Sequence, residues 1–234
     1  MMTWDIQRLR ELVKHIYGAR QLEAISPHID SIEWKIRIAG FHAYSARRAF
    51  DEVFDANERD LSIILARMLS RGQGRIAFMD AKIGYEAHVI AYAQAMHSVA
   101  DILARVVAIA LNISPPSSDD DVTFDTLKAA IPPGPLKDSI TRLRGLTQFR
   151  YMRDFVNQTK HVSLVFSAYS IDLTGNDSRA HGLRFNAFSI GSTMHPHKWG
   201  EDFLLDLLEV AKNYVAVGRQ LNEFLEGLAT PAPT

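Results

Sequence analysis

The stretch DAKIGYEAHVIAYAQAMHSVADILARVVAIALN, residues 80–112, carries the longest helical pattern in the chain. Its apolar side chains recur every three or four residues and leave few positions for solvent, which is typical of a helix inside a bundle. We therefore predict a mostly α protein, a multi-helix bundle built around this segment. The apolar set is Tyr85, Ile90, Met96, Val99, Ile102, Leu103, Val106, Val107 and Ile109.

Further helical patterns lie on both sides of this segment. Residues 3–24 predict an amphipathic helix with Thr3 as its N-cap, ended by Pro27. Residues 30–55 alternate at first as a strand would, but the spacing becomes helical further on, and we favour a helix. The other predicted helices span residues 58–70, 123–131, 136–145, 148–161 and 198–228.

The pattern changes after the helix that ends near residue 161. Residues 162–171 and 183–190 are rich in β-branched and aromatic side chains, and a turn-forming cluster, TGNDS, lies between them. We predict one antiparallel hairpin over about 162–191, inserted before the C-terminal helix. Because an isolated hairpin is marginal in water, this one is expected to pack on the helices.

Composition restricts the classes of function. Hydrophobic residues make up 47 % of the 234 residues, which is enough for a sizeable core. Lys and Arg number 26 against 27 Asp and Glu, so the net charge of -1 gives no global attraction for nucleic acid or anionic membrane. The chain has no cysteine, which excludes disulfides, thiolate catalysis and cysteine-bound metals.

We expect one helical domain over residues 1–229, followed by a disordered tail at 230–234. The N-terminal residues show no apolar signal segment. The most apolar stretch, 99–111, contains Asp101 and Arg105 and is shorter than the roughly 20 apolar residues that a bilayer span needs. The predicted location is therefore the cytoplasm, with no membrane contact.

The long helix carries one polar stripe, formed by Gln94, His97, Asp101 and Arg105 at spacings of three, four and four. His97 and Asp101 are one turn apart, and a carboxylate beside an imidazole raises the histidine pKa and fixes its tautomer. That pair suits a general base or a ligand-binding site. The alternative is a stripe that faces water or forms a satisfied polar network. Because apolar residues surround it, we predict that the stripe is buried.

A second polar group lies on the helix predicted at 148–161. Arg153, Asn157, Lys160 and His161 share one face of it. Arg and Lys supply charge, Asn a donor and His an acid or base, which together suit an anion or phosphate. The alternative is that the last two residues only interact with the helix dipole.

An Arg followed by a polar residue and then by a His along one late helix resembles the signature of the HEPN superfamily. Here these residues are Arg153, Asp154 and His161, with seven residues between Arg and His where the family usually has four to six. HEPN proteins are helical bundles, often dimeric, and many are metal-independent ribonucleases whose Arg and His meet at a dimer cleft. The stretches 157–161 and 97–101 are also similar to uncharacterised bacterial helical proteins.

Residues 137–161 are locally basic, with six Lys and Arg against two Asp, or +4. Aromatic residues among them favour contact with an RNA backbone, and the alternative is a solvated helix face. His181, His195 and His197 lie in or near the hairpin, and the last two have a spacing that can chelate a metal. No carboxylate at a characteristic spacing completes such a site, so we expect no metal and no cofactor.

Two classes of function remain. We favour a non-catalytic module that binds an unknown protein partner or a small ligand in a polar pocket between helices. The alternative is a metal-independent HEPN-type ribonuclease that acts on RNA as a homodimer, so whether the protein is an enzyme stays open. Each polar face is costly to bury alone, and we predict that the two faces meet. The residues implied are His97, Asp101, Asn157 and Lys160 for ligand binding, and Arg153 and His161 for catalysis.

Overall fold

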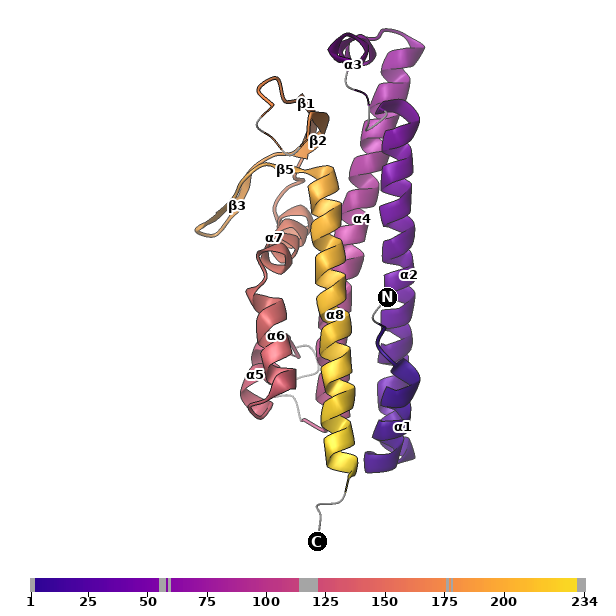
Figure 1. Ribbon diagram of the computed structural model, residues 1–234, viewed down its shortest axis with the longest axis vertical. Helices are drawn as coiled ribbons and strands as arrows, with labels where there is room; N and C mark the ends of the chain where they lie inside the picture. Colours follow the sequence, from indigo (N-terminus) through magenta and orange to yellow (C-terminus); the bar gives the residue numbers. More distant parts are fainter. Residues whose placement is uncertain are drawn as a thin grey trace. The chain divides into compact units, whose positions relative to one another are not determined.

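A computed structural model describes residues 3–54, 58, 60–113, 122–175, 177 and 179–230 of the chain. Over these residues the protein is mostly helical, as predicted, with a small amount of antiparallel sheet (Figure 1). The helices are α1 (Ile6–Tyr17), α2 (Ala19–Phe54), α3 (Leu61–Met68), α4 (Gln73–Ala110), α5 (Phe124–Ala130), α6 (Pro135–Gly145), α7 (Thr147–His161) and α8 (Gly200–Ala229). The strands are β1 (Ser167–Ile171), β2 (His181–Phe185), β3 (Phe188–Ile190), β4 (Thr193–His195) and β5 (Lys198–Trp199).

The first helix differs from its prediction at both ends. α1 begins after Asp5, whose side chain accepts a hydrogen bond from the Arg8 backbone, so Thr3 is not the N-cap. It ends at Gly18, whose φ of +88° is in a region that glycine favours. Pro27 lies inside α2. The predicted end at Pro27 was wrong because a helix of 36 residues tolerates the loss of the one backbone hydrogen bond that proline cannot donate.

The sheet region has more strands than predicted. β1 and β2 form the expected antiparallel hairpin, with Tyr169 opposite Leu183. β5 then pairs with the other edge of β2, giving the order β1-β2-β5. β3 and β4 form a second hairpin. The prediction of a single hairpin was wrong because a tight turn at Gly191, where φ is +56°, directs residues 193–195 back along β3.

The chain divides into two compact units. Unit 1 consists of Met1–Arg37, Met96–Arg150 and Leu208–Thr234, and unit 2 of Ile38–Ala95 and Tyr151–Leu207. The helices α2, α4, α7 and α8 each supply residues to both units. The single domain over 1–229 stays a prediction, and the expected disordered tail lies outside the described residues from position 231 on.

Unit 1 contains a contact that anchors the start of the chain on α8. The Trp4 indole donates a hydrogen bond to the Asn222 side chain at 3.2 Å, and the amide of Asn222 donates to the Asp5 carbonyl at 2.7 Å. The Trp4 ring lies directly over Gly218, where a Cβ atom would overlap it. A glycine at this point of α8 is therefore required by the close approach of the indole.

Unit 2 has an aromatic core. Phe54 packs on Phe78 and Tyr169, with ring centroids 5.0 and 4.8 Å apart, which joins α2, α4 and β1. Phe155 of α7 packs on Phe203 of α8 at 4.9 Å. Such pairs add roughly 0.5–1.5 kcal/mol beyond the area that they bury. This core fixes α7 by its apolar side.

Among the described residues, α4 is the one helix long and apolar enough to cross a membrane. Of its most apolar window, 61 % is buried against the rest of the protein. The core helix of a protein without any membrane contact has the same length and composition, so this helix alone assigns no membrane span.

Candidate functional site

The polar stripe of α4 is more exposed than predicted. His97 Nδ1 lies 3.4 Å from a carboxylate oxygen of Asp101, so the two side chains do pair. The exposed fraction of the Asp101 side chain is 58 %, against 19 % for His97. The prediction of a buried stripe was therefore wrong at Asp101, because α4 keeps one edge in solvent even where its other sides are covered. A pair that water reaches stabilises little.

The polar face of α7 lies where the sequence indicates. The Arg153 side chain is 41 % exposed, Asn157 is half-buried, and Lys160 and His161 are exposed. The other side of the helix is buried. α7 therefore presents these four polar side chains to solvent while its apolar side packs in unit 2. The buried residues of that side are Met152, Phe155 and Val156.

Asp154 is the centre of a buried polar cluster that involves a second chain segment. Its side chain is 4 % exposed, and its Oδ1 accepts a hydrogen bond from Arg153 Nε at 2.9 Å. Its Oδ2 lies 2.9 Å from Nε2 of His195, a buried residue at the end of β4. The His195 ring stacks on Phe188 and meets Tyr151 edge to face. One carboxylate thus pairs with a buried imidazole and with an arginine whose side chain is partly exposed.

This arrangement fixes the direction of Arg153. Because the same carboxylate accepts a hydrogen bond from the Arg153 guanidinium, we assign the donor role in the second bond to Nε2 of His195. A guanidinium that is tied to a buried carboxylate loses little further freedom when it binds an anion. Asp154 and Arg153 were both singled out from the sequence, but the partnership with His195 was not, because 41 residues separate the two.

A buried hydroxyl lies in the same region of unit 2. The Tyr151 hydroxyl has no hydrogen-bond partner among the described residues, and burial, with a smaller effect of Asp206, raises its pKa. The Lys198 ammonium lies 4.4 Å from the centre of the Tyr151 ring and pairs with Asp206. The Tyr151 ring therefore lies against a cation that is already paired with a carboxylate.

The histidines near the sheet do not form the chelate that their spacing suggested. His195 is bound by Asp154 through Nε2, while His197 is exposed. His181 is occupied at both ring nitrogens, by the Tyr169 hydroxyl at 2.7 Å and the Glu58 carbonyl at 2.9 Å. Over the described part of the chain, no group of three or more His, Cys, Asp or Glu side chains is placed to hold a metal ion.

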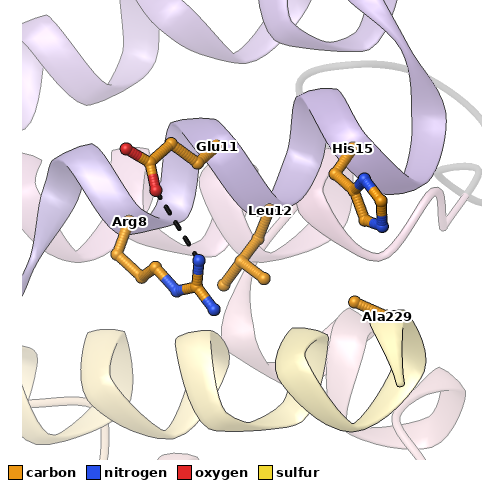
Figure 2. A pocket seen from close by; sticks show the side chains of 5 residues that line it. All are labelled: Arg8, Glu11, Leu12, His15 and Ala229. Atoms are coloured by element: carbon orange, nitrogen blue, oxygen red, sulfur yellow. Dashed lines mark ion pairs between the residues drawn. The ribbon is translucent and has the colours of Figure 1, made fainter.

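Unit 1 has a pocket between α1 and the end of α8, with a volume of about 360 Å³ (Figure 2). Arg8 and Glu11 line it and form an ion pair at 3.6 Å, and Arg8 also binds Glu226 at 2.8 Å. The guanidinium is thus already neutralised by two carboxylates. His15 and Ala229 lie further along the same pocket. This pocket offers little to an anionic ligand.

A second pocket of unit 1, about 340 Å³ in volume, lies between α6 and α8. Arg142 and Arg219 both line it, and neither forms an ion pair with a residue that the structure describes. Asp138 is the one carboxylate in its lining. This is a polar pocket between helices, but it contains none of the residues that the sequence proposed for one.

The two predicted polar faces belong to different units. His97 and Asp101 lie in unit 1, whereas Arg153, Asn157 and the residues after them lie in unit 2. That the faces meet stays a prediction. No protein family, curated protein or solved structure matches this chain. The HEPN resemblance likewise stays a prediction.

Proposed function

We propose that this protein is a binding module for RNA and that the solvent-facing polar side of α7 is its contact surface. The observation that carries the proposal is the fixed position of Arg153. Its side chain is 41 % exposed, while Asp154, which pairs with it, is buried and also pairs with His195. Arg in a fixed orientation is well suited to bind phosphate oxygens through two parallel hydrogen bonds.

The shape of the face favours a chain of phosphates over one small anion. Arg153 and His161 are eight residues apart, which on a helix is about 12 Å. Asn157 lies midway between them, one turn from each. The side chains form a row along the helix and not a pocket. Asp154, the carboxylate paired with Arg153, has a partner on each oxygen, and its sharing with His195 leaves Arg153 less neutralised than Arg8, which is paired with two carboxylates.

Ribonuclease activity of the HEPN kind is the second candidate. The observation that favours it is that His161 is exposed on the same face as Arg153 and can exchange a proton with a ligand. The resemblance implies that these two residues meet at a dimer cleft. Their separation of about 12 Å along one helix is consistent with His161 of a second copy completing the site.

The binding test uses a fluorescent single-stranded RNA and fluorescence anisotropy over a series of salt concentrations. We expect Lys160→Gln and Arg153→Gln each to weaken binding about five- to tenfold and to reduce the salt dependence by roughly one phosphate contact. Matched controls are Lys14→Gln and Arg20→Gln, which remove exposed cations of unit 1. Equal affinities in the variants and the controls would exclude α7 as the contact surface.

The cleavage test incubates the same RNA with the wild type and with His161→Ala and resolves the products on a denaturing gel. Cleavage by the wild type that His161→Ala abolishes would establish the ribonuclease. Binding without cleavage would establish the non-catalytic module. Absence of both binding and cleavage in the folded wild type would reject both candidates.

A further inference from the structure

Two histidines face each other on the helices α2 and α4 of unit 2. His42 of α2 and His88 of α4 approach with their Nδ1 atoms 3.0 Å apart. The ring centroids are 5.2 Å apart and the ring planes are inclined by 38°. Both residues are half-buried, and Phe41, which is 61 % exposed, lies edge-on to both rings. The pair therefore lies at the surface of the unit.

The pair has the chemistry of a metal ligand set. A hydrogen bond between two ring nitrogens needs one donor and one acceptor, so at least one imidazole is neutral. Neither ring forms an ion pair with a described residue. Burial, and then the neighbouring His88, lower the pKa of His42. Neutral imidazole is the form that binds metal ions.

The separation of the two nitrogens favours one coordination geometry. Imidazole nitrogens bind metal ions at about 2.0–2.1 Å, so two nitrogens 3.0 Å apart can share an ion with an N–metal–N angle of about 91–97°. A tetrahedral angle would need them about 3.3–3.4 Å apart. A right angle joins neighbouring positions of the tetragonal sites that Cu²⁺ and Ni²⁺ prefer.

We infer that His42 and His88 form a binding site for one Cu²⁺ or Ni²⁺ ion, whose other coordination positions are filled by water. Binding replaces the N–H···N bond by two metal–nitrogen bonds. The ring that had donated moves its proton from Nδ1 to Nε2 through solvent. When both rings start neutral, no net proton is released. This site is independent of the proposed contact surface for RNA.

The test titrates the full chain with Cu²⁺ or Ni²⁺ in a calorimeter and records the electron paramagnetic resonance spectrum of the Cu²⁺ form. We expect one tight site per chain with two nitrogen ligands. His42→Gln and His88→Gln should each weaken binding about a hundredfold, because one imidazole then replaces a chelating pair. His28→Gln is the matched control, since it removes a half-buried histidine of the same α2 helix.

Circular dichroism of each variant shows whether it is folded, and the two single variants provide independent tests of the same site. Affinity that is unchanged in the double variant His42→Gln/His88→Gln would overturn the inference. So would an equal loss in His28→Gln, which would indicate dispersed binding to surface histidines. Tighter binding of Zn²⁺ than of Ni²⁺ would overturn the right-angle geometry.

Discussion

Replacing Asp154 with alanine tests whether the cluster of Asp154, His195 and Arg153 stabilises the fold. The Asp154 carboxylate accepts hydrogen bonds from His195 Nε2 and Arg153 Nε, each at 2.9 Å. Alanine removes both acceptors. It leaves the Nε2 proton of His195, a residue 7 % exposed, without a partner, whereas the 41 % exposed Arg153 can turn toward water.

These differences in exposure set the expected magnitude. A buried donor without a partner costs about 1–3 kcal/mol. The bond to Arg153 adds about 1 kcal/mol or less, because water replaces it at a half-exposed side chain. We therefore expect Asp154→Ala to lower the free energy of unfolding by about 1–4 kcal/mol. Asp154→Asn keeps one acceptor and should fall between the wild type and Asp154→Ala.

Urea unfolding followed by circular dichroism measures these differences in free energy. The dependence of the free energy on urea concentration should be the same for the wild type and the variants. Asp51→Ala is the matched control, because Asp51 is an exposed carboxylate of the same unit and should change the stability by less than about 0.5 kcal/mol. A double-mutant cycle with His195→Ala should show a coupling of about 0.5–3 kcal/mol. An Asp154→Ala variant as stable as Asp51→Ala would refute the reasoning.

Two further predictions concern helix geometry and pH. Gly218→Ala should lower the thermal midpoint, because its Cβ overlaps Trp4, whereas Gly227→Ala on the same helix meets nothing within 4 Å and should raise stability by about 0.5–1 kcal/mol. The Ser62 hydroxyl, and then its backbone N–H, lower the pKa of Asp60 at the N-cap of α3 below the usual 3.8. The unfolded segment therefore binds the proton more readily, and α3 loses stability as the pH falls through the lowered value. Hydrogen exchange of the α3 amides should reveal this loss in the wild type and not in Asp60→Asn.

The helices were largely predictable because each carries a local signal. The apolar spacing of residues 80–112 identifies α4, and the two faces of α7 follow from the positions of Arg153 and Phe155 alone. The errors came where two local signals compete. Glycine and proline both disfavour a helix interior, and the sequence does not show that Gly18 ends α1 whereas Pro27 lies inside α2.

The sites were less predictable because their residues come from distant segments. His195 reaches Asp154 only because β3 and β4 form a second hairpin, and its sequence neighbour His197 pointed to metal chelation instead. His42 and His88 are 46 residues apart, and neither stands out on its own helix. Contacts between two helices depend on how far one is shifted along the other, and the spacing of apolar residues within each helix does not determine that shift.

Through Asp154, the hairpin of β3 and β4 contributes to the surface that we propose binds RNA. In the sequence it is only the polar residue after Arg153, yet its second oxygen is held by His195 of β4. The direction of the Arg153 guanidinium therefore depends on β4, although no residue of β4 belongs to the row of polar side chains on α7. A phosphate chain needs Arg153 to be held where Asn157 and His161 continue the row, about 12 Å from end to end. A cleavage reaction needs more, because two groups that far apart do not act on one phosphate unless a second copy supplies one of them. The proposed binding therefore needs only one copy of the chain, whereas the proposed cleavage needs two.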